Sequence, residues 1–198
     1  MRVSYPVTFE VDYAERRSRL STFFRLILAI PLGIWLYLYA IVASLAVMIA
    51  WFAIVISGRY PRGLYDFVAG YTRVLSRATA YIALLCDRYA PFGPADDADY
   101  PVRMRFAGPY ERYSRWKTLL RIILAIPIAI LRYVMNLLLE VGAVAAWFVI
   151  VVTGKMPRGL FDLMVLANSY MARSDAYLLL LTETYPPFQD EQTRSAGA

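Results

Sequence analysis

Residues 51–66 read WFAIVISGRYPRGLYD, and residues 147–162 read WFVIVVTGKMPRGLFD. The two blocks begin at Trp51 and Trp147, 96 positions apart, and they align without a gap. In each block an apolar run ends at a glycine, and a proline follows three residues later. This order is typical of a helix that ends in a left-handed glycine cap and is followed by a second helix. The chain therefore contains a duplicated pair of helices joined by a short turn.

The duplication extends well beyond this block. Ile-Leu-Ala-Ile-Pro occurs at 27–31 and 123–127, and Tyr-x-Pro-Phe at 89–92 and 185–188, at the same offset. Tyr-Pro-Val at residues 5–7 recurs at residues 100–102, at an offset of 95 instead of 96. Repeats of this kind define the organisation of a fold before any other signal. We expect a first repeat over 1–93, a plain linker over 94–99, a second repeat over 100–188 and a disordered tail over 189–198.

The repeated motifs resemble a bacterial family known as domain of unknown function 4389. The Trp-Phe-x-Ile-Val-x-[Ser/Thr]-Gly-x-x-Pro-Arg-Gly-Leu-x-Asp block and the closing Tyr-x-Pro-Phe carry the resemblance, which covers nearly all of both repeats. It implies a small membrane protein, and it implies no activity, substrate or catalytic residue.

Composition points to a membrane. The chain is 60% hydrophobic and only 18% charged, whereas soluble domains are about 45–50% apolar and about 25% charged. No charged residue lies between Leu26 and Ser57, and the run from Ile122 to Thr153 contains only Arg132 and Glu140 as charges. Uncharged apolar runs of about 18 residues or more are typical of transmembrane helices.

The same composition excludes most chemistry. There is no histidine, and the single cysteine, Cys86, lies in an apolar stretch. A Ser-His-Asp or Cys-His catalytic set and a zinc site of Cys and His ligands are therefore impossible. We expect no enzymatic activity, cofactor or metal. The net charge of +6 comes from basic residues that flank the apolar runs, so we expect an anionic lipid surface as partner and not nucleic acid.

Each repeat is predicted to have four parts. The first part is a strand in which apolar and polar residues alternate. A basic amphipathic helix at the membrane interface follows, and a proline ends or kinks it. The last two parts are a membrane span and a further helix. The predicted ranges are strand 5–13, interfacial helix 16–30, span 33–57 and helix 62–86, and in the second repeat 101–106, 112–126, 129–153 and 158–182. The fold class is an all-α membrane protein of two tandem repeats, with each span and further helix forming a transmembrane hairpin and four spans in total.

The two strands carry opposite charges on their polar faces. Glu10 and Asp12 lie on the first strand, and Arg103 and Arg105 on the second. Opposite charges across a strand pair stabilise it by about 0.2–1 kcal/mol. We expect the strands to pair at the cytoplasmic surface. The alternative is two unpaired amphipathic strands that lie on the lipid.

Most of the 21 Lys and Arg residues fall in the termini and the central linker region if each repeat is a hairpin. An excess of basic residues marks the cytoplasmic side. We therefore expect a multi-pass protein of the bacterial cytoplasmic membrane with both termini inside. A wholly monotopic protein is the alternative, because the last helix of each repeat is polar.

Two sets of residues are candidate sites. Ionisable groups inside a membrane face the bundle interior and mark pairing or function. The predicted intramembrane polar network comprises Arg73, Arg77, Arg173, Asp66, Asp162, Arg132, Asn136 and Glu140, with Glu140 pairing Arg77 or Arg173. The predicted lipid-headgroup contacts are Arg16, Arg19, Arg25, Arg115, Lys117 and Arg121.

These features favour an accessory or scaffolding membrane protein, either a homo-oligomer or a subunit of a larger membrane complex. The alternative is a small transporter, channel or lipid-handling protein with its pathway at the interface of the repeats. The two arginines Arg77 and Arg173, with Glu140, would line that pathway.

Overall fold

The structure is a computed structural model that describes residues 5–188, so the predicted tail at 189–198 lies outside the described residues. Within residues 5–188, two strands and five helices follow one another. They are β1 (Val7–Val11), α1 (Arg19–Phe23), α2 (Arg25–Ser57), α3 (Arg62–Ile82), β2 (Val102–Phe106), α4 (Arg115–Thr153) and α5 (Arg158–Leu178).

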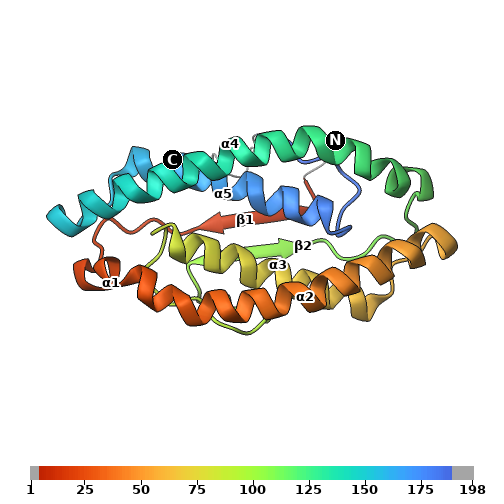
Figure 1. Cartoon of the computed structure of the whole chain (residues 1–198), viewed down its shortest axis with the longest axis horizontal. Coiled ribbons are helices and arrows are strands. Elements are labelled where there is room, and N and C mark those ends of the chain that lie inside the picture. The colour runs from red at the N-terminus through yellow and green to blue at the C-terminus, as the bar shows by residue number, and fades with distance from the viewer. Residues whose placement is uncertain (1–4, 189–198) are drawn as a thin grey trace.

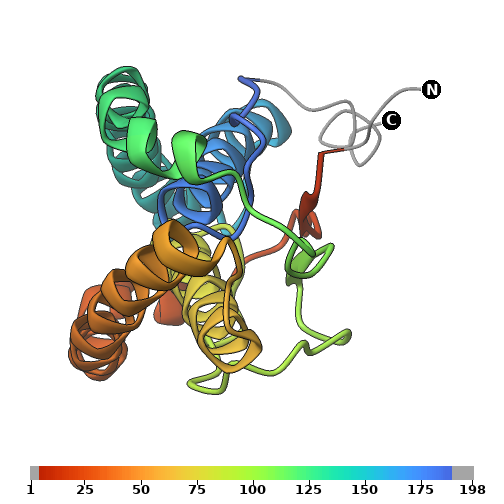
Figure 2. The ribbon, with the colours of Figure 1, turned by 90° about the vertical axis from the view of Figure 1, so that its right-hand side faces the viewer.

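The elements form three layers, and all of them run along the long axis of the molecule (Figures 1 and 2). The long helices α2 and α4 make one outer layer, α3 and α5 the middle layer, and the sheet the other outer layer. Helix α2 packs on α3, and α4 packs on α5, while β2 contacts α3 and β1 contacts α5. The core lies in the middle layer, where Val68, Ala78, Met164 and Ala167 are buried.

The predicted pairing of the two strands is confirmed. Strands β1 and β2 are antiparallel, and Glu10 lies opposite Arg103. The Arg103 guanidinium donates to both carboxylate oxygens of Asp12 at 2.7 and 2.8 Å and to Glu10 at 3.4 Å. Phe9 and Met104 point the other way and are buried against the helices. The sheet therefore has one charged face and one apolar face, as the alternation in the sequence requires.

The long helices differ from the predicted division into interfacial helix and span. Pro31 and Pro127 lie inside α2 and α4, and neither helix ends there. A proline removes one backbone hydrogen bond and bends a helix, but it does not always end it. Both prolines are exposed. Figure 1 shows that both long helices bow away from each other. Each helix continues past its proline, so the interfacial segment and the span form one helix.

Both long helices end as the sequence predicts. Gly58 and Gly154 adopt φ of 72° and 73°, a left-handed conformation, and their amides donate to the carbonyls of Ile54 and Ile150. Glycine adopts this conformation without steric cost.

The two repeats run antiparallel along the long axis of the molecule. The Arg17 amide donates to the Gly154 carbonyl at 2.9 Å, and the equivalent Tyr113 amide donates to the Gly58 carbonyl at 2.8 Å. The start of each repeat therefore lies beside the helix–helix turn of the other. Two hairpins that enter a membrane in the same direction would place both turns far from both starts. The predicted four-span arrangement does not match this structure.

Candidate membrane-binding surface

Helices α2 and α4 expose apolar side chains around most of their circumference. Along α2 a narrow seam is buried, which includes Leu32, Ala43, Ala46, Ala50 and Ile54, and the rest of the helix is largely uncovered. Monomeric soluble proteins seldom expose a contiguous apolar patch larger than a few hundred Å². The large apolar side chains that are more than half exposed on the two helices include Leu26, Ile27, Ile34, Tyr37, Phe52, Ile56, Trp116, Ile122, Ile126, Ile130, Tyr133, Val141, Phe148 and Val152.

Among residues 5–188, only α2 and α4 are long and apolar enough to cross a membrane by length and composition. Helices α3 and α5 lie in the middle layer and have faces buried against both neighbouring layers. The two predicted spans at 62–86 and 158–182 are therefore core helices of this structure.

The opposite outer layer is polar. Glu10, Asp12 and Arg105 are exposed on the sheet, and Asp96 and Asp99 are exposed on the segment that leads into β2. Figure 2 shows the sheet and the long helices on opposite sides of the molecule. The protein is thus amphipathic across its shortest dimension.

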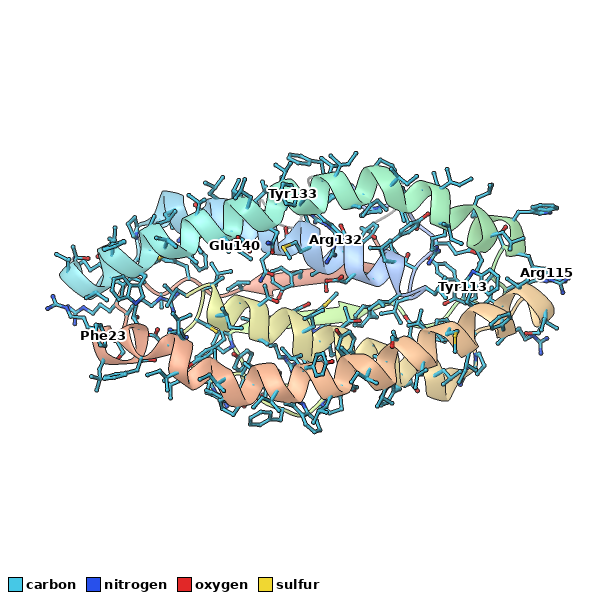
Figure 3. The ribbon with its side chains drawn as sticks, viewed as in Figure 1. Phe23, Tyr113, Arg115, Arg132, Tyr133 and Glu140 are labelled. Atoms are coloured by element: carbon cyan, nitrogen blue, oxygen red, sulfur yellow. The ribbon has the colours of Figure 1, made fainter. Side chains whose placement is uncertain are left out.

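Basic residues gather at both ends of the long axis, because each end combines the start of one repeat with the turn of the other. At one end Arg16 is paired by a β-bridge with Lys155. At the other end Arg115, labelled in Figure 3, lies beside the Gly58 turn. The predicted headgroup residues Arg16, Arg19, Arg115 and Lys117 are all exposed at these ends.

Arg25 and Arg121 correct the prediction, because both are buried and neither is available to a headgroup. Arg25 is 2% exposed and donates to the carbonyls of Tyr81 at 3.1 Å and Cys86 at 2.8 Å and to the Asp87 carboxylate at 2.9 Å. Its guanidinium carbon lies 4.1 Å from the centre of the Tyr81 ring. The arginine thus ties the start of α2 to the end of α3, and we call it the arginine clamp.

The second repeat repeats the carbonyl and ring contacts of this clamp at the equivalent positions. Arg121 donates to the carbonyls of Tyr177 and Thr182, and its guanidinium carbon lies 4.2 Å from the Tyr177 ring centre. Glu183 replaces Asp87 and accepts from the Ser114 amide, as Asp87 accepts from Ser18. In the sequence, the only sign of this clamp is that the arginine and the carboxylate are both present in each repeat.

The predicted polar network is divided among separate local contacts. Arg77, 1% exposed, donates to the carbonyls of Ala95 at 2.8 Å and Val102 at 3.4 Å. Burial lowers its pKa, and the nearby Asp96 opposes that shift. Arg173 donates to Ser169 and to the Phe188 carbonyl. Each of these two arginines therefore binds the segment that follows its own helix, instead of meeting the other in a shared interior.

Most of the remaining predicted residues also contact partners other than those predicted. Arg73 donates to the Met104 carbonyl, and Arg132 forms a 2.7 Å ion pair with Asp175 of α5. Glu140 accepts from Asn136 and does not pair with Arg77 or Arg173 as predicted. Asp162 pairs with Arg158 four residues earlier, and its counterpart Asp66 is exposed near the start of α3. Figure 3 shows Arg132 and Glu140 on the same helix as the outward Tyr133.

A family model described as Domain of unknown function (DUF4389) matches the chain twice, at residues 19–93 and 115–189. The chain belongs to this family. No curated protein and no solved structure matches it. The two DUF4389 matches contain the long helices, the middle-layer helices and both arginine clamps. Strands β1 and β2 lie outside the matches, so the sheet is not part of the matched domain unit.

Two features of the described residues bear on metal binding and on thiol chemistry. No group of His, Cys, Asp and Glu there is arranged to hold a metal ion. Cys86 is buried beside the Tyr100 hydroxyl at 3.4 Å, and burial raises the pKa of its thiol. Reactive cysteines are partly exposed thiolates, so this one has the properties of a structural residue.

Proposed function

We propose that the protein is a non-enzymatic membrane protein that lies flat in one leaflet, with α2 and α4 immersed in lipid and the sheet in water. The observation that carries the proposal is the placement of two long apolar helices on one face and the charged sheet on the opposite face. A bilayer interface is the environment that satisfies both faces at once.

Helix length favours the flat orientation over an upright one. The uncharged stretch Leu26–Ser57 is continuous in α2 and spans about 48 Å at 1.5 Å per residue. A hydrocarbon core of about 30 Å would accept it upright only at a tilt of about 50°, beyond the usual range of about 0–40°. An upright molecule would also carry the exposed charges of the sheet into the bilayer, because the sheet lies beside the middle of the long helices (Figure 1).

A flat molecule fits one leaflet. A helix with side chains is about 10–12 Å across, and half of the hydrocarbon core is about 15 Å thick. The basic clusters at both ends then lie at headgroup level, where anionic lipids attract them. The approximate two-fold axis between the repeats runs along the membrane normal, as in parallel repeats, although the helices lie in the membrane plane.

Within this frame the role is that of an accessory or scaffold protein, as a homo-oligomer or a subunit of a larger complex. Its place is the bacterial cytoplasmic membrane, with the sheet and both termini on the cytoplasmic side. The transport alternative would need Arg77, Arg173 and Glu140 to face a common passage. Arg77 instead contacts the linker and β2, whereas Arg173 and Glu140 contact residues of the second repeat, so we do not favour it.

The four tryptophans provide a direct test, since all of them lie on α2 and α4. Two single-tryptophan proteins would retain Trp35 or Trp116, with the other three changed to Phe. Quenching by phospholipids brominated at different chain depths then measures each position. A flat molecule gives equal depths for Trp35 and Trp116.

An upright molecule gives a different result. Trp35 would lie within about 9 Å of the helix midpoint, and Trp116 about 27 Å from that of α4, at 1.5 Å per residue. Strong quenching of Trp35 by deep bromines with little quenching of Trp116 would therefore refute the flat orientation. A scaffold role is tested separately by cross-linking in membranes, where a purely monomeric and unpartnered protein would contradict it.

A further inference from the structure

A hollow of about 370 Å³ lies at the end of α4, where the chain turns into α5. Its volume is at the lower end of the range of small-molecule sites, about 300–1,000 Å³. The strand end, the last turn of α4 and the turn itself contribute its lining, which consists of Tyr13, Glu15, Val149, Thr153, Lys155, Met156, Pro157 and Arg158. Exposed Phe148 and Val152 lie on the same end of α4. The hollow thus joins a polar rim to the lipid-facing surface.

The rim carries two cations in defined positions. The Lys155 ammonium lies 2.8 Å from the Glu15 carboxylate, and the Arg158 guanidinium lies 3.4 Å from Asp162. Arg158 also lies over the Tyr13 ring, with its central carbon 4.6 Å from the ring centre. Each carboxylate therefore orients one cation. At this end of the molecule the cations outnumber the carboxylates, because Arg16 and Arg19 are added to Lys155 and Arg158.

The lining is held by hydrogen bonds between distant parts of the chain. The Tyr13 hydroxyl donates to the Met156 carbonyl at 2.7 Å, and the Met156 amide donates to the Glu15 carbonyl at 2.8 Å. The Tyr13 ring also packs edge-on against Phe161 at 5.0 Å. A site whose side chains are fixed beforehand loses less conformational entropy when it binds.

We infer that this hollow binds the phosphate group of an anionic phospholipid, with Arg158 and Lys155 on the phosphate and the acyl chains along α4. The inference rests on the proposed membrane function and extends it from general attraction to one defined site. Arginine recognises phosphate through paired N–H donors, and stacking on an aromatic ring fixes its plane. The apolar floor of Val149 and Met156 accepts the glycerol and the first methylenes of the chains.

The turn of the other repeat differs at the aromatic position. Its turn supplies Arg59 and Arg62 in place of Lys155 and Arg158, but the residue aligned with Tyr13 is Gly108. No aromatic ring at that position supports Arg62. We therefore expect one such lipid site per chain, and Arg62→Gln is the matched control for Arg158→Gln.

Native mass spectrometry of the detergent-purified full chain tests the site by titration with phosphatidylglycerol and phosphatidylcholine. Wild type should bind one phosphatidylglycerol more tightly than the rest and more tightly than phosphatidylcholine. Arg158→Gln should weaken that first binding about tenfold, which corresponds to about 1.4 kcal/mol. Arg158→Lys should fall between the two, and Arg62→Gln should leave it unchanged. Circular dichroism of each variant is the check that the substitution of an exposed residue leaves the protein folded.

Glycerol 3-phosphate, added as a competitor, separates a free phosphate from a lipid headgroup. Displacement of the lipid would mean that the phosphoester alone is recognised, and persistence of the lipid would mean that the chains on α4 are needed. Either result supports the phosphate site. Equal loss in Arg62→Gln and Arg158→Gln, or no loss in Arg158→Gln, would overturn it. If wild type still lay flat in phosphatidylcholine vesicles by tryptophan quenching, only the lipid site would have failed.

Discussion

Replacing Arg25 by methionine tests the arginine clamp most directly. The methionine fills much of the same space but cannot donate to the carbonyls of Tyr81 and Cys86 or to the carboxylate of Asp87. Hydrogen bonds to a charged donor contribute about 1.5–3 kcal/mol each, and the two carbonyl bonds are buried. The Asp87 side chain is 31% exposed, so water replaces part of that ion pair. We expect a loss of about 3–5 kcal/mol in the free energy of unfolding.

Urea unfolding of the full chain in a mild detergent, followed by tryptophan fluorescence, measures this loss. Arg25→Lys keeps the charge but not the paired donors, so it should recover only part of the stability. The exposed Arg16→Met serves as control and should change the stability by less than about 0.5 kcal/mol. If Arg25→Met unfolded within about 1 kcal/mol of wild type, the clamp would not be a principal tie between α2 and α3.

Three further changes test other parts of the fold. Gly154→Ala should cost about 1–2 kcal/mol, because φ is +73° and the new methyl group would lie 3.1 Å from Arg19 Nε. By the same urea assay Gly159→Ala, in helix α5 with open space around it, should cost nothing and can stabilise by up to about 1 kcal/mol. Iodoacetamide at pH 8 should label Cys86 slowly in the native protein and rapidly in urea, because burial raises the pKa of the thiol and keeps it protonated; equal rates would contradict its burial. Arg103→Glu should destabilise the sheet by about 1 kcal/mol, since it replaces a salt bridge by like-charge repulsion across the strands, and an unchanged urea midpoint would contradict this.

The sequence predicted those parts of the fold that depend on side-chain type. The repeat, the glycine caps and the strand pairing were all visible, because a left-handed cap favours glycine and opposite charges mark strand partners. The direction of the repeats was not visible. It depends on backbone hydrogen bonds, from Arg17 to Gly154 and from Tyr113 to Gly58, that any residue type can make. Counting basic residues therefore pointed to an arrangement of hairpins that these contacts do not allow.

The candidate surface was only partly predictable. Arg16 and Arg115 are exposed at the helix ends as expected, whereas Arg25 and Arg121 have the same charge and are buried. Charge alone does not separate the two groups. What separates them is the set of acceptors at the end of the following helix, where Arg25 donates to the carbonyls of Tyr81 and Cys86 and Arg121 to those of Tyr177 and Thr182. These backbone acceptors become visible only in the folded structure.

The ion pair between Arg132 and Asp175 shows how one repeat departed from the other without loss of packing. Their counterparts in the first repeat are Leu36 and Thr79, so both positions differ together. The Asp175 side chain is 16% exposed and lies 2.7 Å from Arg132. Burial raises the pKa of Asp175, and Arg132 opposes that shift. A buried carboxylate that loses its partner is strongly destabilising, whereas replacement of both partners by uncharged residues can be neutral.

This asymmetry makes a double-mutant cycle decisive. Arg132→Leu alone should destabilise the protein by about 2–4 kcal/mol at neutral pH, because it leaves Asp175 charged and unpaired. The loss should shrink as the pH falls, since protonation removes the unpaired charge. Arg132→Leu combined with Asp175→Thr recreates the pair found in the first repeat and should return to within about 1 kcal/mol of wild type. If the double variant were as unstable as the single one, the two positions would not be coupled. The departure from symmetry in α4 would then need an explanation outside the chain, such as a contact of Arg132 with a partner.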